Sequence, residues 1–389
     1  TATATVSTCH QKSPPAMQTT RLLPLFIAVL GLLSACSSDN PAITDCQAKH
    51  GVQPVCTFHN PEDIELLPDR KTLLISQMGL SMAHADQGSL VFFNTQTQTV
   101  TPAFPLDNPQ SSAVPEAAND WGASDCPGNP GKTIAPHGIA LRQRDDNRWQ
   151  VAAVNHGGRE SIEMFELLSD ADGPRLEWRG CVIPQSGTYF NDVALLRNGG
   201  FVASHMFDKH ASHLLGMNTS MLKAMLGSHT GYVLEWQPAS GFRVLEESYG
   251  AMINGVELSA DDQHVFANVY FGDEIKKLDR VSGKQLASAT VTRADNLAWD
   301  DQGRLLVVAH GGNLLEQNEC ISHPGSNCVL PYSIIRIDPQ TMHSELLLTH
   351  AGAPMGAGTV ARQVADDLYI GSFSGDRIVK LKYPDSPQP

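Results

Sequence analysis

The feature that most constrains the fold is a unit that recurs six times from residue 60 onward. Each copy holds an apolar strand, a polar turn, a second strand of alternating polarity and, after a gap, a third strand. Alternating apolar residues beside Asp, Asn and Gly turns indicate antiparallel hairpins. The turns and strands recognised in the six copies lie at residues 67–76 with 89–93, 142–154 with 162–166, 196–204 with 231–236, 258–268 with 274–279, 299–308 with 333–338, and 364–371 with 377–381.

Six units of about 55 residues each are long enough for four-stranded blades with loops. The repeat therefore predicts an all-β fold, a six-bladed β-propeller that forms a single domain over residues 37–389. The chain ends as the sixth unit finishes, so residues 37–59 are expected to return and supply the missing outer strand. Closing the ring in this way removes exposed sheet edges.

One segment, residues 205–229 in the third unit, interrupts the repeat. Within it, the Leu, Met and Ala residues of positions 212–226 recur at helical spacing, which predicts a short amphipathic helix inserted in blade three. The helix either packs against a neighbouring blade or forms a lid or membrane-facing cap.

The N-terminal segment has the order of a secretory signal. Met17 is followed by Arg21, by an apolar run over residues 22–33, and by Leu-Ser-Ala-Cys ending at Cys36. The last four residues resemble the bacterial lipobox, whose cysteine is lipidated, and Ser37 resembles the pattern that directs such proteins to the outer membrane. We therefore expect residues 1–36 to be upstream sequence and signal peptide, and the mature protein to be a lipoprotein attached by Cys36 to the outer membrane and facing the periplasm. The alternative is a plain secretory signal, with Cys36 an ordinary thiol.

Charge argues against a nucleic-acid partner. The chain has 41 Asp and Glu against 27 Lys and Arg, a net charge of −14. An acidic surface does not displace the counterions of a phosphate backbone.

Two of the eight cysteines are set aside: Cys9 precedes the expected start at Met17, and Cys36 is the expected lipidation site. Six cysteines remain. Six cysteines allow fifteen pairings, and an oxidising compartment favours disulfides. Proximity in the sequence favours Cys46 with Cys56 and Cys320 with Cys328, which leaves Cys126 for Cys181. A cysteine metal site has no support, because no Cys-x-x-Cys spacing occurs.

Each unit also carries a polar residue six to eight positions before its turn, within the strand expected to be innermost. Innermost strands line the central channel of a propeller, so equal offsets in sequence become a ring of converging side chains. Converging carboxylates would repel one another and lose hydration unless they held a cation. The ring comprises Glu62 and Asp63, His137, Asn191 and Asp192, Asn254, Asp295 and Asn296, and Thr359.

Oxygen atoms dominate this ring, and calcium prefers six to eight oxygen ligands. Zinc would call for nitrogen or sulfur, and magnesium would need fewer side chains. The number of candidate ligands favours two calcium ions, one buried and structural and one reachable from the channel mouth. The simpler alternative is an ion that only ties the blades together.

Seven segments resemble, in order and approximate spacing, the paraoxonase/arylesterase branch of the gluconolactonase-like six-bladed propellers. They start at Glu62, His137, Val154, Asn191, Asn254, Asp295 and Gly358, and the resemblance covers about residues 46–383. It implies a catalytic calcium held by Glu62, Asn191, Asn254, Asp295 and Asn296, and a structural calcium held by Asp63, Asp192 and the carbonyl of Ile139. It also implies that His137 and His156 form the family's histidine pair and that His310 lies in the substrate pocket. The chain departs from the family in its cysteine pattern, in the loops over residues 102–133 and in the blade-three insertion.

These residues favour calcium-dependent hydrolysis of lactones or aryl esters. A cation polarises the carbonyl, His137 takes a proton from the attacking water, and His156 relays it. A structural role is the alternative for each histidine. No Gly-x-Ser-x-Gly motif offers a serine nucleophile. The rival function is a calcium-stabilised periplasmic propeller that binds a ligand without catalysis. The sequence does not name the substrate.

Overall fold

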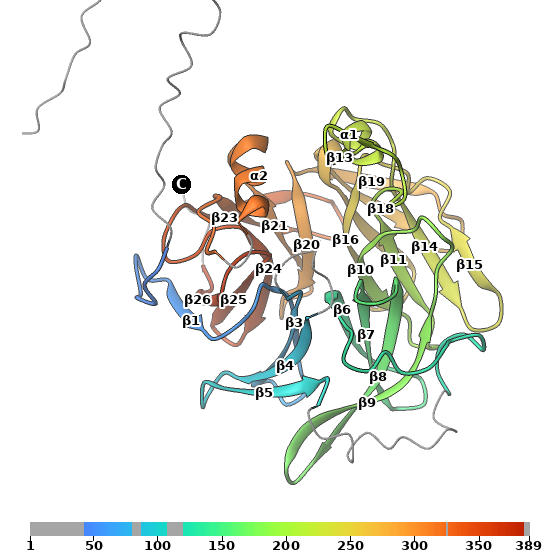
Figure 1. The fold of residues 1–389 in the computed structure, drawn as a ribbon, viewed down its shortest axis with the longest axis horizontal. Helices are drawn as coiled ribbons and strands as arrows, with labels where there is room; N and C mark the ends of the chain where they lie inside the picture. The colour runs from blue at the N-terminus through green and yellow to red at the C-terminus, as the bar shows by residue number, and fades with distance from the viewer. Residues whose placement is uncertain (1–42, 80–86, 107–119, 324–325, 385–389) are drawn as a thin grey trace, which may run out of the picture. The chain divides into compact units, whose positions relative to one another are not determined.

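The computed structural model describes residues 43–384 apart from 80–86, 107–119 and 324–325. Six four-stranded sheets account for all but two of its strands, and consecutive strands pair antiparallel within each sheet (Figure 1). The prediction of a six-bladed propeller is confirmed. From the innermost strand outward, the blades are β2 (Pro61–Leu66), β3 (Thr72–Gln77), β4 (Ser89–Asn94), β5 (Thr99–Phe104); β6 (Pro136–Gln143), β7 (Trp149–Asn155), β8 (Ser161–Asp170), β9 (Gly173–Val182); β10 (Phe190–Leu195), β11 (Phe201–His205), β14 (Tyr232–Gln237), β15 (Gly241–Val244); β16 (Ile253–Leu258), β17 (His264–Val269), β18 (Glu274–Asp279), β19 (Gln285–Thr290); β20 (Ala294–Trp299), β21 (Leu305–His310), β22 (Tyr332–Ile337), β23 (Ser344–His350); and β24 (Gly358–Val364), β25 (Asp367–Ser372), β26 (Arg377–Lys382), β1 (Gln53–Cys56).

The ring closes as the repeat predicts. The strand β1, from the start of the described chain, pairs antiparallel with β26 and aligns Val55 with Ile378. The innermost strands β2, β6, β10, β16, β20 and β24 contact one another in that order, and β24 contacts β2. The sixth blade therefore joins the first and last strands of the described chain, and this closure holds the channel walls in a fixed arrangement.

The hydrophobic core lies between neighbouring blades, because each sheet buries both faces. Phe104 of blade one packs edge-on against Phe165 of blade two, with ring centroids 4.9 Å apart. Phe93 of blade one packs against Tyr369 of blade six, with centroids 6.2 Å apart. This packing explains why the middle strands have continuous apolar runs with few polar interruptions.

The helix in the blade-three insertion is shorter than the predicted segment. Only α1 (Thr219–Met225) is helical, and Asn218 caps its first turn. The residues before it form a small hairpin, β12 (His213–Leu214) and β13 (Met217–Asn218), around Gly216 at φ +83°. The glycine permits a turn that a continuous helix would not allow, so the helical spacing of the first Leu and Met residues is misleading.

A second helix, α2 (Leu314–Ser322), follows β21 in blade five and was not predicted. Asn313 and Glu316 form a capping box at its start. Within the described residues, no helix is both long and apolar enough to cross a membrane.

Three disulfides pair the cysteines as predicted: Cys46 with Cys56, Cys126 with Cys181, and Cys320 with Cys328. Cys46–Cys56 fastens the closing strand β1 to the loop that precedes it. Cys36 and the signal segment lie outside the described residues.

Candidate active site

All six innermost strands bring a polar position to the same level of the channel. Glu62, His137, Asn191, Asn254, Asp295 and Thr359 are each the second residue of their strand. In every blade the pairing of the two inner strands shifts register across this position, as between Pro61 and Ile64 or between Phe190 and Val193. Such a bulge leaves the extra residue unpaired and changes the direction of its side chain. Two successive residues can then both direct their side chains toward the channel.

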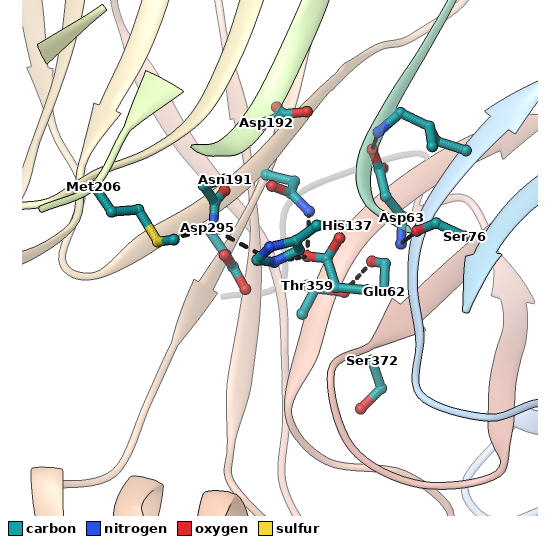
Figure 2. Close-up of polar contacts among 12 residues, drawn as sticks. Glu62, Asp63, Ser76, His137, Asn191, Asp192, Met206, Asp295, Thr359 and Ser372 are labelled. Atoms are coloured by element: carbon teal, nitrogen blue, oxygen red, sulfur yellow. Dashed lines mark hydrogen bonds and ion pairs between the residues drawn. The ribbon is translucent and has the colours of Figure 1, made fainter. Parts of the chain in front are cut away.

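The predicted catalytic calcium ligands form what we call the oxygen cluster: Glu62, Asn191, Asn254, Asp295 and Asn296. Asn296 Nδ2 of blade five donates to Glu62 Oε1 of blade one at 2.7 Å. Thr359 Oγ1 donates to the carbonyl of Glu62 at 2.5 Å. Figure 2 shows Glu62, His137, Asn191 and Asp295 converging on one region. The structure thus brings together side chains from four blades that are far apart in the sequence.

Four oxygens of this cluster are buried and have no hydrogen-bond partner: Glu62 Oε2, Asn191 Oδ1, Asn254 Oδ1 and Asn296 Oδ1. Leaving one buried acceptor unpaired costs about 1–3 kcal/mol. Burial raises the pKa of Glu62 well above its usual value, with Asp63 and Asp295 adding to the shift. A group of unpaired oxygens around a carboxylate is the donor set that a hard cation requires, so these residues fit calcium.

The cluster is built mainly from carboxamides. Among the described residues, no group of three or more His, Cys, Asp or Glu side chains is arranged to hold a metal ion. Carboxamide oxygens are ordinary calcium ligands.

Asp63 and Asp192, the carboxylate pair, use their oxygens differently. Asp63 accepts from the N–H of Ile64 at 2.8 Å and from the N–H of Ile139 in the next blade at 2.7 Å. Asp192 accepts in the same way from Val193 at 2.7 Å and from Val256 at 2.9 Å. Each carboxylate thus ties two blades together.

Burial raises the pKa of Asp63 to about 6, even though these N–H groups and Arg362 oppose the shift. Burial, reinforced by Asp63, also raises the pKa of Asp192 well above its usual value. The contact that involves Ile139 is made by its N–H, and coordination by its carbonyl stays a prediction.

An open cavity of about 1100 Å³ adjoins the carboxylate pair from the far ends of the innermost strands. Beyond Asp63 and Asp192 its lining includes Glu65 and Arg362, whose carboxylate and guanidinium lie 3.0 Å apart. Burial raises the pKa of Glu65 to about 8. The oxygen cluster does not line this cavity, so the two sets of residues face different environments.

His137 and His156 form the predicted pair. His137 Nδ1 lies 3.0 Å from His156 Nε2, and its other nitrogen, Nε2, lies 3.5 Å from Asn191 Nδ2 and 3.8 Å from Glu62 Oε1. Burial, together with His156, lowers the pKa of His137 well below its usual value. His137 is therefore neutral near pH 7 and can accept a proton next to the oxygen cluster.

His310 also lies at the cluster, at the end of β21. Its Nε2 donates to the carbonyl of Gly358 at 2.9 Å and lies 3.2 Å from Asp295 Oδ2. Its Nδ1 faces the hydroxyl of Tyr270 at 2.8 Å, and Gln317 of α2 donates to that hydroxyl at 2.6 Å. The unpredicted helix thus supports a residue of the site.

Sequence reasoning missed two further residues. Glu160 lies 3.0 Å from His156 Nδ1, and the Asn268 side chain donates to the carbonyl of Asp295 while its Oδ1 is buried and unpaired. Glu160 stands in an irregular turn after β7, outside the repeat. Asn268 lies between Ala267 and Val269 in the middle strand β17, and a polar residue between these apolar neighbours was the available signal.

The ring of six four-stranded blades, with polar side chains gathered at one level of its channel, places this chain among the six-bladed propellers. The chain belongs to the arylesterase family, whose model matches residues 57–378. Membership in that family implies a carboxylic ester hydrolase. A search of curated proteins found no match.

Two of the solved structures that match this chain illustrate the shared fold. One, described as a luciferin-regenerating enzyme, is 13% identical with a TM-score of 0.50, covering 85% of this chain and 94% of that chain. The other, a gluconolactonase from Xanthomonas campestris, is 17% identical with a TM-score of 0.50, covering 90% and 96%. At these identities the similarity concerns the fold alone.

Proposed function

We propose that this protein is a calcium-dependent hydrolase of lactones and aryl esters. The observation that carries the proposal is the oxygen cluster, in which four buried oxygens from four blades have no partner. Glu62, Asn191, Asn254, Asp295 and Asn296 would hold the ion. A calcium ion bound there would polarise the substrate carbonyl and stabilise the negative charge that develops on its oxygen. A second, structural calcium would be held by the carboxylate pair and Ile139.

His137 acts as the general base in this proposal. Its Nε2 faces the oxygen cluster, and its lowered pKa keeps the ring neutral. It takes the proton of the attacking water, and His156, at 3.0 Å from its Nδ1, receives the proton from the far side of the ring. His310 holds Asp295 in place through its Nε2.

The proposal also covers the preferred substrate and the cellular location of the protein. A lactone preference rests on the family and on the apolar insertion, where Leu215 and Leu226 are 99% and 86% exposed. We further propose that the insertion covers the substrate and that lipid on Cys36 attaches the protein to the outer membrane on its periplasmic side.

A calcium-stabilised propeller that binds a ligand without catalysis is the second candidate function. The observation that favours it is burial: Glu62 and Asn296 are each 1% exposed and His137 is 5% exposed. In that case the oxygen cluster would hold its ion only to fix the blades.

Hydrolysis assays separate these functions. Purified protein is tested on a panel of lactones and on phenyl acetate, with calcium, with chelator, and with calcium restored. We expect turnover of lactones that disappears on chelation and returns with calcium. Loss of the ion should also lower the melting temperature, since a ligand that binds only the native state contributes about 3–4 kcal/mol when far above its Kd. A melting temperature that responds to calcium, in a protein that hydrolyses none of the substrates, would support the binding propeller instead.

A further inference from the structure

The side chain of Glu160 lies behind the histidine pair and is almost surrounded by donors. Its Oε2 lies 3.0 Å from His156 Nδ1 and accepts from Lys209 Nζ at 2.9 Å. Its Oε1 accepts from the backbone N–H of Phe190 at 2.8 Å. The Glu160 side chain is 10% exposed and that of His156 only 4%. His156, Lys209 and the backbone N–H of Phe190 thus hold the Glu160 carboxylate in place.

Glu160 is ionised in these surroundings. Burial alone would raise its pKa, but His156 and Lys209 outweigh burial and hold the pKa below its usual value. Lys209 comes from the blade-three insertion, and its ammonium also lies 5.3 Å from the centroid of the Tyr189 ring, which packs against His156. Two elements outside blade two therefore hold the carboxylate.

The direction of each hydrogen bond follows from this charge. An ionised carboxylate only accepts, so His156 Nδ1 must carry a proton. A neutral His156 then presents an unprotonated Nε2 to His137, so His137 Nδ1 must donate to it. The lone pair of neutral His137 is thereby left on Nε2, the atom that faces Asn191 and Glu62.

We propose that Glu160 is the positioning residue that sets the tautomers of His156 and His137 and so directs the basic nitrogen of His137 toward the oxygen cluster. When His137 accepts a proton, positive charge spreads over the pair, and the Glu160 carboxylate stabilises that charge. This role is analogous to that of the carboxylate in a Ser-His-Asp triad. The inference rests on the proposed function, because it assigns Glu160 to the same proton transfer.

The first test compares three variants with the wild-type holoenzyme. Glu160→Gln keeps the shape and removes the charge, so we expect kcat on a lactone to fall about 10- to 100-fold with KM changed less than about twofold. Glu160→Asp keeps the charge and should recover much of that loss. Glu163→Gln is the matched control, because Glu163 is buried and ion-paired to Arg159 at 2.7 Å in the same blade without contacting either histidine.

The kinetic outcomes decide the role directly. If Glu160→Gln keeps kcat within about twofold, if Glu163→Gln loses as much activity, or if Glu160→Asp is no better than Glu160→Gln, the positioning role is overturned. A loss that appears only in KM overturns it too, since tautomer control acts on the chemical step.

The second test reads the tautomers without catalysis. Nitrogen NMR of histidine-labelled protein, assigned with His137→Gln and His156→Gln, should show protons on Nδ1 of both rings, and Glu160→Gln should broaden or redistribute these signals. A proton on His137 Nε2 in the wild type would overturn the inference. If the expected tautomers are found but His137→Gln hydrolyses lactones normally, the proposed general base fails while the assignment of the hydrogen bonds stands.

Discussion

On the bulged strands β2 and β10, members of the oxygen cluster and of the carboxylate pair are consecutive residues, yet their oxygens are used in different ways. In the carboxylate pair, every side-chain oxygen accepts a backbone N–H, and one N–H for each residue comes from the neighbouring blade. In the oxygen cluster, four oxygens accept nothing. The side-chain oxygens of the carboxylate pair are all hydrogen-bonded within the chain, whereas four oxygens of the cluster have no hydrogen-bond partner.

This difference in hydrogen bonding distinguishes buried oxygens that connect blades from buried oxygens that are available to bind a ligand. A carboxylate that accepts backbone N–H groups of two blades links those blades directly. Unpaired buried acceptors do not stabilise the fold, and a protein keeps them where a ligand completes them. The comparison therefore predicts that substitutions at the two levels have opposite signatures in activity and stability.

The largest effect is expected for Asn254→Ala in the oxygen cluster. Loss of one ligand should reduce hydrolysis by at least about 10³-fold, and Asp295→Ala should behave in the same way. Because Asn254 Oδ1 has no partner, the melting temperature in chelator should change little. Lactonase assays and melting curves with and without calcium measure both effects.

Asn327→Ala provides the control for that variant. Both ends of the Asn327 amide are hydrogen-bonded, to the carbonyl of Ile43 and the N–H of Asp376. It should lose stability with and without calcium and keep its activity. An active, calcium-dependent Asn254→Ala protein would contradict the assignment of the cluster.

His137→Gln should lower kcat by about 10²-fold while leaving the calcium midpoint unchanged, because the imidazole supplies base assistance and no oxygen ligand. His350→Gln is a suitable control, since His350 is partly buried and contacts the carbonyl of Gly352. Kinetics and calcium titration of both variants test this. If His137→Gln keeps the parent kcat, a base other than His137 takes the proton.

Asp192→Asn should act mainly on stability. The new amide must place a donor against either Val193 N–H or Val256 N–H, and losing such a buried contact costs about 1–3 kcal/mol. The melting temperature should fall even in chelator, whereas kcat of the folded protein should stay within about tenfold. Loss of hydrolysis with no loss of stability would place Asp192 in the catalytic cluster.

The smallest effect is a change in pH dependence. Burial raises the pKa of Asp63 from 3.8 to about 6, so the calcium-free native state binds a proton more tightly than the unfolded chain does. Stability of the chelated protein should therefore be greatest below about pH 4 for this group and decline as the pH rises toward 6. Calcium should reduce the decline, because it favours the ionised carboxylate, and Asp63→Asn should flatten it. Urea midpoints across this range test both statements, and a chelated protein that gains stability over the range would contradict them.

Much of the site could be predicted because it follows the repeat. Glu62, Asn191, Asn254 and Asp295 stand at equal offsets before their turns, and the same offset puts them at the second position of each innermost strand. The bulges, however, have no marker in a single sequence. Without them, two consecutive residues such as Asp295 and Asn296 would point to opposite faces of a strand.

Features outside the repeat were harder to predict. The helix α2 carries Leu315 at 82% exposure, so it lacks a clear buried stripe and gives little periodic signal. Glu160 acts through contacts with His156, Lys209 and Phe190, which come from two blades and an insertion. Their proximity depends on how separate segments pack.

The six blades, the closing strand and the polar level of the channel could be predicted from the sequence, because alternation and turn residues act locally and repeat at regular intervals. Which side-chain oxygens have hydrogen-bond partners depends on contacts between blades. Asp63 reaches the N–H of Ile139 and Glu62 the amide of Asn296 across distances of 76 and 234 residues. Hydrogen bonds between blades depend on bulge geometry and ring closure, and that spatial arrangement pairs every side-chain oxygen of Asp63 and Asp192 but leaves four oxygens of the cluster unpaired.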